Sequence, residues 1–462
     1  MLPFMSSPLR NAAERPALAA DGGGGWILHG ALAEKIDRLR QNLVGANKGL
    51  IFCLAPSSTA GALAYLAAAA SGHAVLPLHP TIPALDDLIA AYRPEWIIAP
   101  PDAAFQTARY HPRDWDLPDM RLWRDAKVEA EATHPDLFLL LLTSGSTGGR
   151  KAVRLSHANI ASNTAAIIAS QGLTAATRAL LPLPLAYSFG LSVLHSVLAA
   201  GGSVVMTEAG VASRDLWTLA REREATLFCG VPYHYETLAR LGLDALKVPT
   251  LKTFLQAGGR LAPDIAASLL RQIAARDGEF FIMYGQTEAA PRMACLPLHR
   301  RPDKLGAVGQ ALSGGSFALC DGEVIYTGPN VMMGYAENRA DLALGDTQGG
   351  ALATGDLGQL DDEGYLTLTG RQKRFSKILG QRVALDALEA IASAVAPAAA
   401  FAHNDSVIVM TATQDQAALA KMKERRAAMT TLPPACFILR PVASLCYQAN
   451  GKLDYQRMEA MV

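Results

Sequence analysis

The sequence has few cysteines and no net charge, and each deficit excludes a class of protein. Its 462 residues contain six cysteines, none of them in a CxxC pair. So sparse a set excludes a disulfide-rich secreted scaffold and a zinc-finger framework, and we expect reduced thiols. The 42 basic residues balance 42 acidic residues. Because neutralising phosphates requires a clustered basic excess, we expect no nucleic-acid partner.

The sequence also lacks a long unbroken apolar run. The uncharged stretch that begins at Gly49 is interrupted at Pro56, Gly72 and Pro77. No segment therefore reaches the roughly 20 apolar residues that a membrane-spanning helix needs. The first residues, MLPFMSSPLRNAAERP, lack the basic-then-apolar order of a signal peptide. We expect a cytoplasmic protein without a transmembrane segment.

The sequence does have enough apolar content for a large core. Half of its residues are hydrophobic and 18% are charged, which is typical of a folded protein. Short strand-like runs, such as Leu50–Leu54, alternate with longer Ala/Leu-rich stretches, such as 61–70. The alternation recurs around Ser203–Met206 and 280–283. It predicts an α/β fold with largely parallel sheets.

The pattern changes twice toward the C-terminus. The segments 322–335 and 364–368 look like short strands punctuated by glycine, which predicts a small β-rich subdomain. After Arg371 the sequence becomes basic and then helical again. Since this length argues for two or more domains, we predict an N-terminal α/β body over 1–372 and a small α+β C-terminal lid domain over 373–462.

A loop rich in glycine and hydroxyl side chains follows the apolar run 138–142. Its candidate phosphate-binding residues are Thr143, Ser144, Gly145, Ser146, Thr147, Gly148 and Lys151. Glycines let backbone N–H groups approach phosphate oxygens, hydroxyls donate hydrogen bonds, and the lysine supplies charge. The spacing differs from that of the P-loop, GxxxxGK[ST]. The alternative is a flexible linker, but linkers seldom begin at the end of a buried strand, so the loop favours polyphosphate binding.

This loop resembles the signature loop of the adenylate-forming enzymes: acyl- and aryl-CoA synthetases, peptide-synthetase adenylation domains and firefly luciferase. The family pattern has Pro where this chain has Arg150. Further motifs of the family follow in order, so the resemblance covers residues 138–455. It implies a large α/β body with a small β-rich subdomain, followed by a mobile C-terminal lid.

Several of these motifs imply a nucleotide site. YGQTE at 284–288 resembles the family's YGxTE element, in which Tyr284 would stack on adenine, Thr287 contact the α-phosphate and Glu288 hold Mg²⁺. Asp356, in a TGD motif, would bind both ribose hydroxyls, with Arg371 nearby. The implied nucleotide-binding set also includes Gly258, Gly259 and Gly285.

The C-terminal motifs imply a catalytic lysine on a hinged domain. An NGK motif ends at Lys452; in the family this lysine bridges the substrate carboxylate and the α-phosphate. Together with Thr287 and Glu288 it forms the implied catalytic set. The basic run 371–377 resembles the family's hinge, with Lys373 at the pivot. Relatives commonly carry Pro-Arg where this chain has Cys446-Tyr447, a departure that bears on docking of the thiol acceptor.

The segment 184–192, PLAYSFGLS, resembles the family segment that borders the acid substrate. The acid-pocket candidates are Tyr187, Ser188, Gly190, Tyr233 and His234. Peptide-synthetase domains place an Asp near the position of Gly190 to bind the substrate ammonium, and no carboxylate occupies this stretch. Because a buried cation without a partner is costly, the sequence favours a fatty or aryl acid over an amino acid. Alternatively, Tyr187 and Tyr233 are plain core aromatics.

The resemblance implies a reaction in two halves. ATP and Mg²⁺ would convert a small carboxylic acid to its acyl-adenylate. The acyl group would then pass to the thiol of coenzyme A, or of phosphopantetheine on an acyl or aryl carrier protein. Three alternatives stay open: an amino-acid adenylating enzyme that loads a carrier protein, a non-catalytic nucleotide-binding relative, and a luciferase-like oxygenase.

Overall fold

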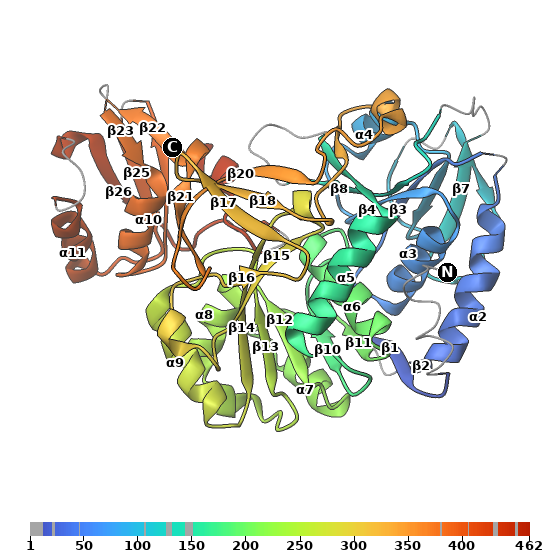
Figure 1. Ribbon diagram of the computed structural model, residues 1–462, viewed down its shortest axis with the longest axis horizontal. Helices are drawn as coiled ribbons and strands as arrows, with labels where there is room; N and C mark the ends of the chain where they lie inside the picture. The colour runs from blue at the N-terminus through green and yellow to red at the C-terminus, as the bar shows by residue number, and fades with distance from the viewer. Residues whose placement is uncertain are drawn as a thin grey trace.

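The chain forms two large sheets, a smaller antiparallel sheet, and a C-terminal group of strands and helices (Figure 1). The computed structural model describes residues 13–20, 24–45, 47–105, 108–125, 132–143, 151–378, 381–404, 406–427, 433–448 and 451–462. Within these ranges no helix combines the length and the apolar character that crossing a membrane demands.

The first large sheet has eight strands. Their order is β19 (Gly334–Ala336), β9 (Ala152–Ser156), β8 (Leu137–Leu142), β4 (Ala74–Leu78), β3 (Leu50–Leu54), β5 (Trp96–Ala99), β7 (Arg121–Asp125) and β6 (Tyr110–Arg113). Its centre, β8-β4-β3-β5, is parallel. These four strands are almost wholly apolar and buried, as expected for a parallel sheet covered on both faces.

The second large sheet has nine strands. Their order is β16 (Gln310–Ala311), β15 (Arg292–Pro297), β14 (Glu279–Gly285), β13 (Thr253–Gln256), β12 (Leu227–Gly230), β10 (Arg178–Leu181), β11 (Ser203–Met206), β1 (Pro16–Ala20) and β2 (Ile27–Leu28). The six strands from β14 to β1 are parallel. The two sheets confirm the expected α/β class, with antiparallel strands added at the edges.

Helices connect and cover these strands. Those of the body are α2 (His29–Arg40), α3 (Thr59–Ala70), α4 (Leu85–Tyr92), α5 (His157–Gln171), α6 (Ser188–Ala199), α7 (Arg214–Glu222), α8 (Pro232–Leu241) and α9 (Pro263–Ala274). Helix α5 contacts β8 and β9 of the first sheet and β15 of the second, and α3 contacts β3, β4 and β1. Both helices therefore tie the two sheets together.

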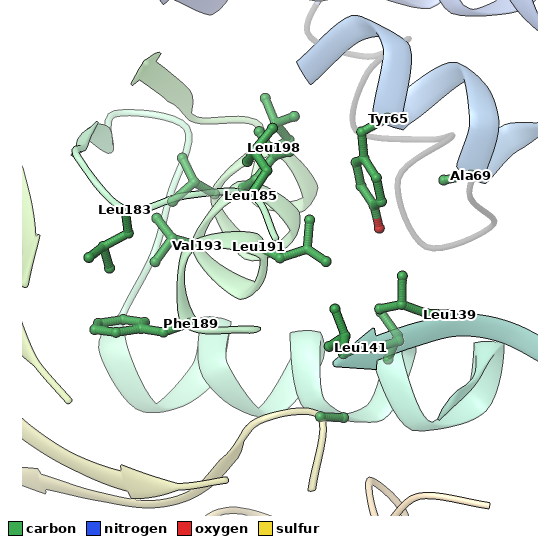
Figure 2. Packing of buried hydrophobic residues seen from close by; sticks show 14 of the residues in the cluster. Tyr65, Ala69, Leu139, Leu141, Leu183, Leu185, Phe189, Leu191, Val193 and Leu198 are labelled. Carbon is green, nitrogen blue, oxygen red and sulfur yellow. The ribbon is translucent and has the colours of Figure 1, made fainter. Parts of the chain in front are cut away.

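Helix α6 lies in this shared core. Figure 2 shows Leu191 of α6 facing Tyr65 of α3, with Leu139 of β8 beside them. A buried polar contact joins the two helices: the Tyr65 hydroxyl and Nε2 of His195 are 2.8 Å apart. Burial lowers the pKa of His195 to about 3, so the imidazole is neutral at physiological pH. Helix α6, which begins at the candidate acid pocket, is thus buried in an apolar core.

The predicted β-rich subdomain is an antiparallel sheet of four strands: β17 (Ser316–Cys320), β18 (Glu323–Thr327), β20 (Ala351–Leu360) and β21 (Leu366–Arg371). In Figure 1 it lies between the two large sheets and the C-terminal elements. Strands β20 and β21 pair so that Asp356 is opposite Arg371. This register brings two predicted site residues side by side.

The C-terminal region has its own strands and helices. They are the hairpin β22 (Phe375–Ile378) and β23 (Gln381–Ala384), the sheet β24 (Ala398–His403), β25 (Ser406–Thr411) and β26 (Phe437–Pro441), and the helices α10 (Leu385–Ser393), α11 (Gln416–Ala427) and α12 (Tyr455–Glu459). Two apolar clusters are built only from residues of 378–458, whereas the clusters of the body end at Leu366. The α+β lid is consistent with this separation, and the boundary at 372/373 stays a prediction.

Candidate active site

The predicted site residues gather at the carboxyl edge of the second large sheet. Tyr284 and Gly285 end β14, Gly258 follows β13, and Val231 follows β12. Tyr187 lies in the loop that joins β10 to α6. Ligands bind at this edge of open parallel sheets because the loops there converge. One end of the fold therefore presents segments that are far apart in sequence.

Asp356 receives two protein donors. The Tyr284 hydroxyl donates to its Oδ2 at 2.5 Å, and Nε of Arg371 donates to its Oδ1 at 2.8 Å. Burial and the nearby carboxylate of Asp356 both raise the pKa of Tyr284. Burial alone would lower the pKa of Arg371, but Asp356 and Asp386 outweigh it, so the net shift is upward. The carboxylate is thus fixed in place, with lone pairs left to accept hydrogen bonds from a ligand.

Glu288 is linked to the glycine-rich loop through a tyrosine. The Tyr335 hydroxyl donates to Oε1 of Glu288 at 2.9 Å. The Nζ of Lys151 lies 3.6 Å from the centroid of the Tyr335 ring, a cation–π contact. The backbone N–H of Thr143 donates to the carbonyl of Lys151 at 3.4 Å, so the two ends of the loop meet. The other loop candidates lie outside the described residues: Ser144, Gly145, Ser146, Thr147 and Gly148.

The donor set at Glu288 suits a magnesium ion that also binds phosphate. In the described part of the chain, no group of three or more His, Cys, Asp or Glu side chains could enclose a metal by itself. Mg²⁺ is commonly held by one or two carboxylates together with substrate phosphates and water. Oε1 of Glu288 accepts the hydrogen bond from Tyr335, and Oε2 is the oxygen that would bind the ion. A site with a single carboxylate therefore fits.

Lys452 reaches this edge from the C-terminal region. Its Nζ lies 5.6 Å from the centroid of the Tyr187 ring. Burial and the charge of Arg371 lower the pKa of Lys452, while Glu288 and Asp356 raise it. Lys452 is 164 residues after Glu288 and 96 residues after Asp356 in the chain. The structure therefore brings the three together.

Two further contacts join the C-terminal region to the body. The rings of Tyr447 and Tyr233 lie 5.2 Å apart, centroid to centroid. A Cβ added to Gly451 would lie 2.5 Å from Cγ2 of Val231, so the turn before Lys452 is packed closely on the start of α8. Tyr233 is therefore at the contact with the lid. Lys373 is in the short turn Gln372–Arg374, and its side chain is outside what the structure describes.

The acid-pocket candidates divide into two groups. Tyr187 and Ser188 face the nucleotide motifs: the hydroxyls of Ser188 and Thr287 are 3.3 Å apart. Gly258 has φ +84°, and a Cβ there would lie 2.4 Å from the Tyr187 hydroxyl. Only glycine permits both this backbone conformation and the close approach of the tyrosine.

The remaining candidates have packing partners of their own. A Cβ on Gly190 would lie 2.5 Å from the Pro184 carbonyl oxygen, so this glycine lets α6 pack against the preceding loop. Nδ1 of His234 accepts from the Val231 N–H at 3.3 Å, and burial lowers the pKa of His234 to about 4. Gly259, a candidate of the nucleotide-binding set, accepts a hydrogen bond at its carbonyl from the Gln256 side-chain amide at 2.9 Å. Their roles at a ligand stay predictions.

Sequence reasoning did not single out two residues that the structure places at the site. Tyr335 joins Lys151 to Glu288, and Arg292 lies buried beside Phe189 of α6. A signal for Arg292 is present in the sequence: it is a lone cation at the start of an otherwise apolar strand, four residues after Glu288. For Tyr335, the sequence carries no comparable signal.

Comparison with known proteins identifies the family of the chain. The family model of AMP-binding enzymes matches residues 7–336. The chain belongs to this family. This chain is 28% identical over 396 residues to a feruloyl-CoA synthase of Amycolatopsis sp. The alignment covers 80% of this chain and 78% of that protein. The chain is also 28% identical over 358 residues to a 2-succinylbenzoate–CoA ligase of Bacillus velezensis, covering 73% and 71%.

A solved structure shows the same fold for the whole AMP-binding enzyme. It is the o-succinylbenzoate CoA synthetase of Bacillus subtilis in complex with its acyl-adenylate intermediate. The TM-score is 0.75 at 20% identity, with 99% of this chain and 98% of that chain covered. The match includes the C-terminal region that lies beyond residue 336.

Proposed function

We propose that this AMP-binding enzyme is an AMP-forming carboxylic acid–CoA ligase. It would activate a fatty or aryl acid with ATP and transfer the acyl group to the thiol of coenzyme A. The observation that carries the proposal is the placement of Lys452 over Tyr187, within electrostatic reach of Glu288 and Asp356. The CoA ligases among its relatives support the same reaction.

In the first half-reaction, an oxygen of the acid attacks the α-phosphorus of ATP and pyrophosphate leaves. Two anions must approach each other, so the site must place positive charge between them. Lys452 would sit there and contact the acid carboxylate and the α-phosphate. Thr287, whose hydroxyl lies 3.3 Å from that of Ser188, would donate its hydroxyl to the α-phosphate. When bound at Glu288, Mg²⁺ would offset the charge of the phosphates.

The remaining nucleotide contacts are proposed for Asp356, Tyr284 and the glycine-rich loop. Asp356 would accept both ribose hydroxyls, and Arg371 and Tyr284 hold it in position. Tyr284 would offer its ring to the adenine. The loop from Thr143 to Lys151 would hold the departing pyrophosphate, and Tyr335 would keep Lys151 beside Glu288.

The second half-reaction requires Lys452 to withdraw. Rotation of the C-terminal domain about Lys373 would remove the lysine and open a path for a thiol. The thiol sulfur would attack the acyl carbonyl and release AMP, so no protein nucleophile is needed. The acceptor is proposed to be coenzyme A, with a carrier-protein phosphopantetheine as the alternative acceptor.

The test is pyrophosphate release from ATP and Mg²⁺ with a panel of fatty, aryl and amino acids and no thiol. We expect Lys452→Ala to lower release by roughly 1,000-fold, since it removes a charge aimed at the transition state. The control is Lys421→Ala, an exposed lysine on α11 of the same region, which should leave release unchanged. Lys452→Ala should still form thioester from a preformed acyl-adenylate.

Three outcomes would contradict the proposal. Equal loss of both half-reactions in Lys452→Ala would refute the role given to this lysine. Turnover of α-amino acids alone would favour an amino-acid adenylating enzyme. ATP binding without pyrophosphate release on any acid would favour a non-catalytic nucleotide-binding protein.

A further inference from the structure

Arg292 is a buried cation whose backbone is firmly held. It begins β15 and is 2% exposed. Its N–H donates to Oδ1 of Asn163 at 3.2 Å, and its carbonyl accepts from the side-chain amides of Asn163 at 2.7 Å and Asn330 at 3.0 Å. The backbone from which the guanidinium extends is therefore held within the fold.

The guanidinium itself has few partners. Its Nε is buried and has no hydrogen-bond partner among the residues that the structure describes. Its Nη2 reaches the Ser192 hydroxyl only at 3.4 Å, and its Cζ lies 4.6 Å from the Phe189 ring centroid. The Ser192 hydroxyl donates to the Phe189 carbonyl at 2.8 Å, which leaves its oxygen to accept. An arginine can donate five hydrogen bonds, so most of this capacity is unused.

Two other buried arginines show how this fold normally satisfies such a group. Arg339 is also 2% exposed, and its Nη1 and Nη2 donate to the two oxygens of Glu95 at 3.0 and 2.5 Å. Arg154 is 1% exposed and donates to the carbonyls of Met333, Tyr335, Leu344 and Gly345. Among the arginines that the structure describes as fully buried, Arg292 is the one that lacks such partners.

No neighbouring group of the described residues supplies a negative charge. The titratable groups that act on Arg292 are Cys295, Tyr187 and Cys229. Burial raises the pKa of each to about 12, so all three are neutral at physiological pH. Burial lowers the pKa of Arg292 to about 10, and the guanidinium stays charged there. A buried charge without a counter-charge is strongly unfavourable.

The location of Arg292 indicates what would compensate this charge. Phe189 and Ser192, which touch it, are on the first turns of α6, immediately after Tyr187. Tyr187 lies under Lys452 and is close enough to Arg292 for the guanidinium charge to lower the pKa of its hydroxyl, against the larger effect of burial. Two cations, Lys452 and Arg292, are thus placed about one tyrosine.

We propose that Arg292 binds a second anionic group of the acid substrate, so that the enzyme activates one end of a dicarboxylic acid. The carboxylate at Lys452 attacks the α-phosphorus and releases pyrophosphate. The carboxylate at Arg292 does not react and is carried unchanged into the thioester. This inference rests on the proposed ligase function and specifies its substrate class. The same cation would reject the ammonium group of an amino acid.

The test compares matched pairs of acids in the pyrophosphate-release assay: hexanoate with adipate, and benzoate with the three benzene dicarboxylates. Wild-type enzyme should give a kcat/KM for at least one diacid that is 30-fold or more above that of its monoacid, by an order-of-magnitude estimate for a buried charge pair. Arg292→Met should lower this ratio by roughly 100-fold, because the second carboxylate would then enter an apolar site. Arg292→Lys should retain part of the preference.

Controls separate recognition from a structural role. Arg300→Met removes an arginine just beyond the same strand whose side chain is 71% exposed, and it should leave the ratio unchanged. Arg292→Met should melt at the same temperature as wild type or higher, since it removes an uncompensated buried charge. A lower melting temperature together with equal losses on monoacids and diacids would overturn the inference in favour of a structural arginine.

The outcomes also distinguish the inference from the proposed function. The inference would be overturned if the enzyme activated only monoacids and Arg292→Met left the diacid-to-monoacid ratio of kcat/KM unchanged. The ligase function would then still stand. Should no acid release pyrophosphate, the ligase proposal fails, and calorimetric titration of the diacids in the presence of a non-cleavable ATP analogue decides the anion site. Diacid binding that Arg292→Met weakens would support it, and no diacid binding to wild-type enzyme would overturn it.

Discussion

The nucleotide side and the acid side of the candidate site satisfy their charges differently. On the nucleotide side, Asp356 already receives hydrogen bonds from Tyr284 and Arg371, and Glu288 receives one from Tyr335. On the acid side, the buried guanidinium of Arg292 has one long contact to a serine hydroxyl and a neighbouring aromatic ring.

This difference indicates where selectivity resides. Groups that protein partners hold in place are preorganised for a ligand, and binding then costs little reorganisation. A buried charge without a partner lacks such preorganising contacts. It favours the ligand that supplies the missing charge and disfavours ligands that do not. Under the proposed function, the nucleotide side would bind one constant substrate, and the acid side would discriminate among acids.

The largest effect is expected where a paired buried arginine loses its partner. Glu95→Gln would remove the negative charge that two nitrogens of the buried Arg339 guanidinium contact, and we expect a loss of roughly 3–5 kcal/mol in the free energy of unfolding. Urea denaturation of this variant beside Arg292→Met sharpens the comparison, because the second change should cost little or stabilise the protein. Similar large losses for both variants would show that Arg292 is as well satisfied as Arg339.

The next effect concerns the carboxylate that is held ready for the nucleotide. Asp356→Asn keeps the shape of the side chain but removes its charge, and with it the charge-assisted bond from Arg371. We expect the dissociation constant for ATP to rise by roughly 100-fold, since hydrogen bonds to charged groups are worth about 1.5–3 kcal/mol each. Titration calorimetry measures this directly. Unchanged ATP affinity would remove Asp356 from the nucleotide site.

Part of this site could be predicted from the sequence because the motifs fall at predictable places in an α/β fold. YGQTE ends β14 and Gly258 follows β13, and the carboxyl ends of parallel strands share one edge of the sheet. The antiparallel pairing of β20 with β21 sets Asp356 opposite Arg371. Two short strands close together in the sequence are enough to predict such a pairing. These groupings follow from secondary structure alone.

Other features depend on tertiary packing that a linear pattern does not carry. Gly190 is predicted to border the acid pocket, and that role stays a prediction. A Cβ at Gly190 would lie against the Pro184 carbonyl oxygen, a close approach that only the packing of α6 on that loop reveals. Tyr335 lies on β19, which pairs with β9, and this pairing of strands distant in sequence brings it to Lys151. The absence of a carboxylate near Arg292 likewise becomes visible only once all of its described neighbours are known.

A smaller effect is expected for the tyrosine that couples the loop to Glu288. Tyr335→Phe keeps the ring over Lys151 but removes the hydrogen bond to Glu288. One such bond to a charged group is worth about 1.5 kcal/mol, so kcat/KM for ATP should fall by roughly tenfold. Raising the Mg²⁺ concentration should recover part of this loss if Tyr335 positions Glu288 for the ion. Tyr335→Leu, which also removes the ring, should show a larger loss.

The smallest effect is expected at the contact between the lid and the body, where the chain departs from its family. The rings of Tyr447 and Tyr233 form a tilted pair, and an aromatic pair contributes about 0.5–1.5 kcal/mol. Tyr447→Ala should therefore lower the rate of adenylate formation by roughly threefold, because the orientation that presents Lys452 becomes less populated. Thioester formation from preformed acyl-adenylate should not slow, and it should speed up if release of this contact limits rotation of the lid. Stopped-flow measurement of each half-reaction separates the two rates. A loss confined to the thioester half would instead show that Tyr447 docks the thiol acceptor, and the contact with Tyr233 would then have no part in holding Lys452 in place.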